Sequence, residues 1–305
     1  MTSGARGSIG IIGLGAMGSA MSEHLLASGY KVAGIDIDIK RCQAATKLGV
    51  EITELNMIAS SADCLITSMP SFDAALKVLS RSSPLMQSLQ RKTIIIETST
   101  LSLRQKATLN NEVELSNGVL LDCPMSGTAH QAREADLVAY LSGDDSEAKM
   151  YATSFLESFT RSVLDLGAFG NGTLTKLIAN HLVAVHNVAA AEALSIAHAA
   201  NMDLPTVLNA VSAGAGNSRM LEIRGPLMIR EDYIPAGMRV DLFLKDLGLI
   251  AELTDELDVS SPLLDSAHQI YTIASGEGRD SQDTACAYSV MKTMRKQDRS
   301  IHGEV

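Results

Sequence analysis

The segment Ile9-Gly10-Ile11-Ile12-Gly13-Leu14-Gly15-Ala16-Met17-Gly18 decides the fold. Its first four residues are typical of a buried strand and Ser19–Ser28 of a helix, so a G-x-G-x-x-G pattern joins strand to helix. There the first glycine makes a tight turn, the second lets backbone approach a pyrophosphate, and the third lets helix pack on strand. Free N–H groups at the helix start bind phosphate. The alternative is a glycine-rich turn without a ligand, but the position favours a dinucleotide site formed by Gly13, Leu14, Gly15, Ala16, Met17 and Gly18.

An acidic residue follows the second predicted strand. Asp36, in Gly34-Ile35-Asp36-Ile37-Asp38, stands where a carboxylate accepts hydrogen bonds from the adenosine ribose and repels a 2′-phosphate. The alternative is that Asp36 and Asp38 only start a turn. Lys40 and Arg41 are close enough in sequence to meet a phosphate. We expect NAD in preference to NADP.

Short β-branched runs alternate with helical patterns from Ser8 to about Leu166, as successive βαβ units of a parallel sheet do. This predicts an N-terminal Rossmann-type, doubly wound α/β domain over residues 1–170. The predicted strands are Ile9–Ile12, Lys31–Asp36, Cys64–Ser68, Thr93–Glu97, Val119–Asp122, Leu137–Ser142 and Ser162–Asp165.

The remainder, residues 171–305, has the pattern of an all-α domain. Thr173–Leu204 contains neither glycine nor proline, and a helix over most of it would be roughly 40 Å long. This long interdomain helix is apolar nearly all round, which indicates burial in the second domain or against another subunit of a homodimer or homotetramer. Further helices are expected at Leu204–Ser212, Arg239–Leu257, Pro262–Ser275 and Asp283 to about Lys296.

Composition limits the partners. A chain of 305 residues is about right for two domains, and its net charge of −10 argues against a nucleic-acid or anionic-membrane surface. Four widely spaced cysteines without a C-x-x-C pair indicate reduced thiols. Met1–Gly7 leads into a strand without the apolar stretch of a signal peptide, so we expect a soluble cytoplasmic protein. The histidines lack ligand spacing, and no metal is expected.

Three later segments bear on the chemistry. Ser126-Gly127-Thr128 follows a predicted strand and offers a hydroxyl and backbone N–H groups to a carboxylate. Gly170-x-Gly172-x-x-x-Lys176-x-x-x-Asn180 places a lysine and an asparagine on one face of the long helix. Lys245-Asp246 adds a second lysine beside a carboxylate.

Together these motifs resemble the β-hydroxyacid dehydrogenases, from Ile9 to about Met294, and most closely their L-threonate branch. The resemblance implies NAD-dependent oxidation of the 3-hydroxyl of a small acid, with hydride transfer from C3 to the nicotinamide. It also implies that Lys176 is the catalytic acid/base and that Asn180 supports it. By the same resemblance Ser126, Gly127, Thr128, Lys245 and Asp246 bind substrate, while Met69, Pro70, Thr100 and Lys245 lie along the cofactor.

The chemistry needs such a lysine, because the hydroxyl must lose a proton and a desolvated lysine can have its pKa lowered toward the working pH. Lys176 could instead be a surface lysine, and Lys245-Asp246 a solvated pair. Thr128 replaces the family's usual second glycine and could offer an extra hydroxyl, while Met238 replaces a common aromatic residue. Asn217 and Ser218 could meet extra substrate hydroxyls or form a helix-terminating turn.

Other functions fit the same scaffold. One is an imine reductase or another semialdehyde reductase, although a cationic lysine at Lys176 suits an imine poorly. Another is a non-catalytic NAD-binding module, because fold alone does not imply activity.

Overall fold

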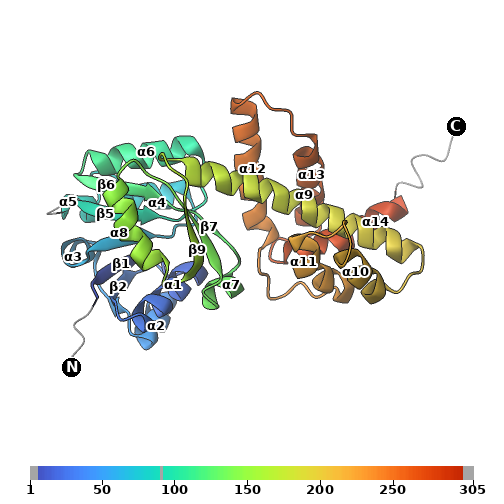
Figure 1. Cartoon of the computed structure of the whole chain (residues 1–305), viewed down its shortest axis with the longest axis horizontal. Helices are drawn as coiled ribbons and strands as arrows, with labels where there is room; N and C mark the ends of the chain where they lie inside the picture. Colours follow the sequence, from blue (N-terminus) through green and yellow to red (C-terminus); the bar gives the residue numbers. More distant parts are fainter. Residues whose placement is uncertain (1–5, 90–91, 298–305) are drawn as a thin grey trace. The chain divides into compact units, whose positions relative to one another are not determined.

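The computed structural model describes residues 6–89 and 92–297 (Figure 1). The expectation of no signal peptide rests partly on residues 1–5, which lie outside the described residues. The chain forms two compact units, Met1–Lys176 and Leu177–Val305.

Unit 1 is built on a six-stranded sheet in which every neighbouring pair is parallel. The strand order is β3-β2-β1-β4-β5-β6, so it reverses between β1 and β4. At such a switch point the loops at the carboxyl ends of the strands diverge and leave room for a ligand. The strands are β1 (Ser8–Ile12), β2 (Lys31–Ile35), β3 (Glu51–Ile52), β4 (Cys64–Thr67), β5 (Thr93–Glu97) and β6 (Gly118–Asp122).

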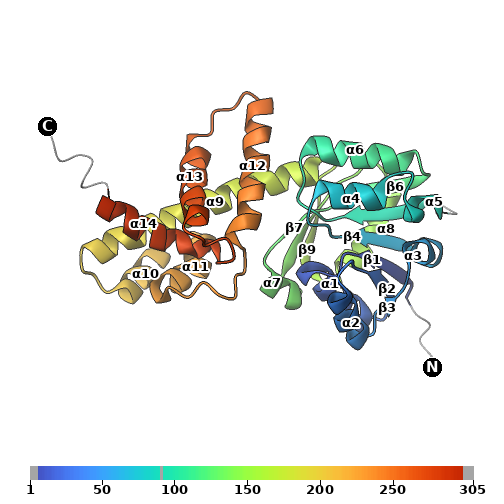
Figure 2. The same ribbon diagram turned by 180° about the vertical axis from the view of Figure 1, so that it is seen from behind.

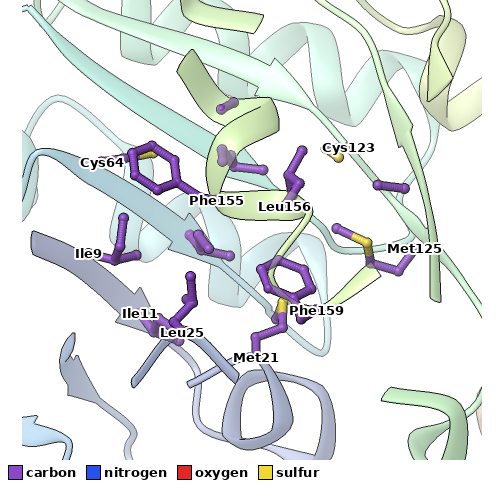
Figure 3. Packing of buried hydrophobic residues seen from close by; sticks show 14 of the residues in the cluster. Ile9, Ile11, Met21, Leu25, Cys64, Cys123, Met125, Phe155, Leu156 and Phe159 are labelled. Carbon is purple, nitrogen blue, oxygen red and sulfur yellow. The ribbon is translucent and has the colours of Figure 1, made fainter. Parts of the chain in front are cut away.

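Alternate residues of these strands enter separate cores on the two faces of the sheet, as the pleat requires. Ile11 packs in one core with α1 (Ala16–Ala27) and α8 (Ser146–Leu156), where Phe155 contributes an aromatic ring (Figure 3). Ile12 enters the opposite core, against four further helices of the unit. These are α3 (Leu55–Ser61), α4 (Phe72–Leu79), α5 (Pro84–Gln87) and α6 (Leu103–Glu114); α2 (Ile39–Leu48) follows β2.

The last two predicted strands do not join the parallel sheet, so that part of the prediction was wrong. β8 (Leu137–Leu141) and β9 (Thr160–Asp165) form a separate three-stranded sheet with β7 (Met125–Ser126), which pairs antiparallel to β8. In β8 buried and half-buried residues alternate, whereas all of β4 is buried. A strand covered on only one face belongs to the rim of the domain rather than its centre.

Unit 2 is helical, and α9 (Asn171–Ala199), which begins in unit 1, supplies its longest element. In this unit α12 and α13 lie side by side (Figures 1 and 2). The other elements are α10 (Leu204–Ser212), α11 (Arg219–Arg230), α12 (Val240–Glu256), α13 (Pro262–Gly276), a 3₁₀ turn (Thr284–Cys286) and α14 (Ala287–Gln297).

Two details of unit 2 differ from the expectation. α9 ends at Ala199 because Asn201 has a φ of 57°, and Asp203 then caps a new helix, α10. α11 was not predicted. Within the described residues α9 is the single helix whose length and composition would allow a membrane span, which is weak evidence because core helices of soluble proteins pass the same test.

Candidate active site

The glycine loop has the geometry that a dinucleotide requires. Gly13 has a φ of +95°, and a Cβ there would lie 2.3 Å from the carbonyl oxygen of Ser68. A Cβ on Gly18 would lie 1.9 Å from the carbonyl oxygen of Gly13, so only glycine lets α1 approach β1 this closely. Gly15 precedes α1, whose first turn has neither a side-chain cap nor an acidic residue. The N–H groups of Ala16 and Met17 therefore suit a pyrophosphate.

Asp36, the expected ribose acceptor, has partners within the chain. Its Oδ2 accepts a hydrogen bond from the Leu14 N–H (2.8 Å) and its Oδ1 one from the Asp38 N–H (2.8 Å), so it also holds the glycine loop. The side chain is 4% exposed, and Arg41 Nη1 lies 3.4 Å from Oδ2. A carboxylate has lone pairs for further donors, so these bonds leave room for ribose hydroxyls.

The turns carrying Met69, Pro70 and Thr100 are linked to each other. The Met69 N–H donates to Ser99 Oγ (2.8 Å), and Thr98 Oγ1 donates to the Thr67 carbonyl (2.8 Å). The Ser99 N–H in turn donates to Glu97 Oε1 (2.9 Å). The structure thus brings together the two segments expected along the cofactor, through a serine and a glutamate that were not predicted.

The Ser126-Gly127-Thr128 segment runs from the last residue of β7 to the start of α7 (Ala129–Arg133), and Thr128 caps the helix. Thr128 Oγ1 accepts from the Gln131 N–H (3.3 Å), and Gln131 Oε1 accepts from the Thr128 N–H (3.0 Å). This capping box uses the Thr128 groups that were expected to face a carboxylate. The idea of an extra substrate hydroxyl at Thr128 loses its support, while Ser126 stays at the end of its strand.

Lys176 lies near the start of α9 and is 7% exposed, so it is not the surface lysine of the alternative interpretation. Asn180 follows it one turn later on the same helix. The two side chains therefore project from the same face of α9.

Asn180, Lys245 and Asp246 form a polar cluster in unit 2. Asn180 Nδ2 donates to Asp246 Oδ2 (2.9 Å), and Lys245 Nζ lies 3.2 Å from Asp246 Oδ1. The Asp246 side chain is 7% exposed and that of Lys245 is 39% exposed. Asp246 therefore orients the asparagine and holds the lysine at the edge of solvent, where it can meet a charged ligand.

Asn217 and Ser218 have structural partners. Ser218 Oγ accepts from the Leu221 N–H (3.1 Å) and caps α11, and Asn217 Nδ2 donates to Glu222 Oε1 (2.7 Å). Both residues lie at the start of a helix. The alternative considered from the sequence, a turn that terminates a helix, is therefore wrong in its direction. Throughout the described part of the chain, no group of three or more His, Cys, Asp or Glu could hold a metal ion.

Two family models match successive parts of the chain. The family model for the NAD-binding domain of 6-phosphogluconate dehydrogenase matches residues 8–168. The model described as NAD-binding of NADP-dependent 3-hydroxyisobutyrate dehydrogenase matches residues 170–291.

Individual proteins match over nearly their full length. L-threonate dehydrogenase of Cupriavidus necator is 30% identical, over 92% of this chain and 95% of its own. Mitochondrial 3-hydroxyisobutyrate dehydrogenase of Rattus norvegicus is 26% identical, over 93% and 87%. A crystal structure of 3-hydroxyisobutyrate dehydrogenase from Salmonella typhimurium is 27% identical with a TM-score of 0.83, over 93% of this chain and 99% of its own. The chain therefore belongs to the β-hydroxyacid dehydrogenase family and is an NAD(P)-dependent oxidoreductase of small hydroxy acids.

Proposed function

We propose that the substrate is a polyhydroxylated acid of about four carbons, such as L-threonate, and that Lys176 moves the proton. The observation that carries the substrate is the 30% identity to an L-threonate dehydrogenase over almost the whole of both chains. Asn217 and Ser218 do not support this substrate assignment, because their side chains bond to residues at the start of α11. The Lys176 role is supported by its burial and by its place on α9 before Asn180.

In the proposed reaction Lys176 moves the proton and Asn180 positions the reacting groups. The nicotinamide, when bound, accepts a hydride from the carbon that bears the hydroxyl; position 3 is the expectation from the family resemblance. Lys176 takes the hydroxyl proton during oxidation and returns it during reduction. Asn180, held by Asp246, orients the hydroxyl and the amine of Lys176. Positioning of this kind supplies a large part of an enzyme's rate.

Other residues bind the two ligands. Ser126, with the backbone of Gly127, and Lys245, which Asp246 holds, complement the substrate carboxylate. Thr128 supports this turn by capping α7. Lys245 also contributes to the cofactor site. Gly13, Leu14, Gly15, Ala16, Met17 and Gly18 hold the pyrophosphate, while Met69, Pro70 and Thr100 line the nicotinamide side. In this scheme the domain of residues 1–170 binds the dinucleotide, and that of residues 171–305 serves substrate binding and assembly.

NAD is proposed over NADP because of Asp36. Its side chain is nearly buried, and a 2′-phosphate beside it would meet a carboxylate in a poorly solvated place. Arg41 is the group that could oppose this, but its ion pairs with Asp36 and Asp38 offset its charge.

The test is steady-state kinetics with NAD and NADP and a panel of acids. We expect higher kcat/KM with NAD, and higher kcat/KM for L-threonate or erythronate than for 3-hydroxyisobutyrate. A preference for NADP would make Lys40 or Arg41 phosphate ligands. A higher kcat/KM for 3-hydroxyisobutyrate would reject the proposed substrate assignment but not the family assignment. Activity only with a cyclic imine, or none with any acid, would favour the reductase or the non-catalytic alternative.

We further propose a homodimer or homotetramer in the cytoplasm, without nucleic-acid or membrane partners. Ile178, Leu182 and Ile196 of α9 are 54%, 48% and 66% exposed, and their spacing places them on one helical face. The four cysteines are free thiols, as in a reducing compartment. Light scattering is expected to give a multiple of 32.3 kDa at micromolar concentration; the monomer mass would contradict the assembly.

A further inference from the structure

Lys106 on α6 is completely buried, yet the proposed chemistry does not use it. Its side chain and that of Glu97 are both 0% exposed, and the two are in direct contact. Its Nζ also lies 2.9 Å from Asp122 Oδ1, a second fully buried carboxylate. Glu97 ends β5 and Asp122 ends β6, so this buried cluster lies at the carboxyl edge of the parallel sheet.

The Glu97 side of the cluster leads to the cofactor segments. Glu97 Oε1 accepts from the Ser99 N–H (2.9 Å), and Ser99 Oγ accepts from the Met69 N–H (2.8 Å). The same carboxylate that pairs with Lys106 therefore shapes the turn that carries Thr100 and connects it to Met69-Pro70.

The Asp122 side leads to the start of α9. Asp122 accepts from Thr173 twice, Oδ1 from the hydroxyl (2.7 Å) and Oδ2 from the backbone N–H (2.7 Å). Ser142 Oγ donates to Asp122 Oδ2 (3.2 Å) and accepts from the Gly172 N–H (2.9 Å). A Cβ on Gly172 would lie 2.3 Å from the Tyr140 carbonyl oxygen, so glycine is needed for this approach. Lys176 stands three residues beyond Thr173.

The charges of the cluster are matched by its surroundings. Burial alone would lower the pKa of the Lys106 ammonium, but the charges and hydrogen bonds of Asp122 and Glu97 outweigh this and raise it. The two carboxylates carry one negative charge more than Lys106 can balance. N–H groups of the Ser99 turn and of the N-terminus of α9 donate to these carboxylates and stabilise the remaining negative charge. A buried ion cluster adds little net stability compared with apolar packing. What this cluster does provide is a set of bonds from the ends of β5 and β6 to Ser99 and Thr173.

We propose that Lys106 is a positioning residue of the dehydrogenase, which fixes the turn beside the nicotinamide through Glu97 and the α9 turn that carries Lys176 through Asp122. One buried cluster thus fixes the position of the proton acceptor, Lys176, relative to the turn beside the nicotinamide. The inference deepens the proposed function and rests on the role of Lys176 given there.

Each branch can be tested by removing one hydroxyl. Thr173→Val deletes a bond to Asp122 and keeps the backbone N–H; we expect kcat to fall about 5- to 30-fold, with KM for the acid and the NAD dissociation constant within about twofold. Ser99→Ala deletes the acceptor for Met69 and should weaken NAD binding about 5- to 30-fold. Thr173→Ser keeps the hydroxyl and should restore kcat to within about twofold of the wild type.

Thr160→Val is the matched control. Thr160 is also a buried threonine of unit 1, and its hydroxyl donates to the Leu156 carbonyl (2.8 Å), with no bond to the cluster. It should lower the thermal midpoint about as much as Thr173→Val but leave kcat unchanged. Lys106→Met should combine both kinetic defects if it folds; since it exposes two buried carboxylates to each other, the branch variants decide the matter in any case.

Two results would overturn the proposal: Thr173→Val with normal kcat and only the stability loss of the control, or Thr173→Ser as slow as Thr173→Val. Lys176→Ala, measured in parallel, separates this from failure of the proposed function. Normal turnover in Lys176→Ala rejects the proton role of that lysine. Loss of turnover there, with normal kcat in Thr173→Val, rejects only the positioning by the cluster.

Discussion

Two lysines are buried among the residues that the structure describes, Lys106 and Lys176, and they have different tasks in our account. Lys106 is paired with two carboxylates and keeps its charge. Lys176 is proposed to exchange a proton with the substrate. In this account Lys106 therefore positions other residues, whereas Lys176 takes part in the reaction itself.

Lys176→Ala is expected to lower kcat by about 10²- to 10⁴-fold, the usual contribution of a positioned proton donor or acceptor. NAD affinity should change little, because the glycine loop and Asp36, the proposed dinucleotide site, are held by a hydrogen bond of their own that does not involve Lys176. Steady-state kinetics and NAD titration measure both quantities. The contrasting variant is Lys245→Ala, which should raise KM for the acid more than it lowers kcat, because its proposed role is to bind a carboxylate. Near-normal turnover in Lys176→Ala would make Lys245 the leading candidate.

The sequence indicates some of these residues but not others. The glycine loop and Lys176 stand in local patterns, and local patterns can be recognised in one chain. Lys106 is a single lysine in a polar helix, for which a solvated side chain is the ordinary expectation. Its partners are supplied by the ends of β5 and β6, so only the sheet order brings them to it.

Among the elements, α11 shows how a polar pair can serve structure instead of substrate. Ser218→Ala should lower the free energy of unfolding by about 0.5–2 kcal/mol, the usual cost of a lost N-cap. The ratio of kcat/KM for L-threonate to that for 3-hydroxyisobutyrate should stay unchanged. Urea unfolding and kinetics measure the two effects. Ser266→Ala is the control, an exposed helical serine bonded only to its own helix, and it should be nearly neutral. A changed substrate ratio in Ser218→Ala, with unchanged stability, would return Ser218 to the substrate site.

Element prediction succeeded where hydrophobic pattern and position agree. Fully buried strands such as β4 are continuous apolar runs and were predicted close to their ends. β3 has two exposed residues and no such signal. β8 and β9 were predicted as strands, but their sheet depends on β7, a two-residue strand that no periodicity reveals. α11 contains Gly225 and Pro226, which sequence rules count against a helix.

For the whole molecule, buried proton-binding groups predict a loss of stability at high pH. Burial raises the pKa of the Tyr271 hydroxyl, and raises that of Tyr233 to about 12. Burial also raises the pKa of the Cys64, Cys123 and Cys286 thiols. Above about pH 8.5, where exposed cysteines begin to ionise, and more so above about pH 10, where exposed tyrosines ionise, the folded chain therefore holds more protons than the unfolded chain. Stability must then fall as pH rises, and the raised pKa of Lys106 acts in the same direction.

Urea unfolding between pH 7 and about pH 11 measures this dependence. We expect a constant free energy of unfolding up to about pH 8.5, a decline above it, and a steeper decline above about pH 10 that is shallower in Tyr271→Phe. An unfolding free energy that stayed constant to pH 11 would show that these groups ionise alike in both states.

The central claim, hydride transfer from a hydroxy acid to a nicotinamide with Lys176 as proton acceptor, is tested most directly by isotope transfer. The protein is mixed with NAD and L-threonate deuterated at both C2 and C3, and the reduced cofactor is examined by mass spectrometry. The account predicts reduced cofactor that carries one deuterium, formed about 10²- to 10⁴-fold more slowly by Lys176→Ala. Reduced cofactor without deuterium, or an equal rate from Lys176→Ala, would contradict it.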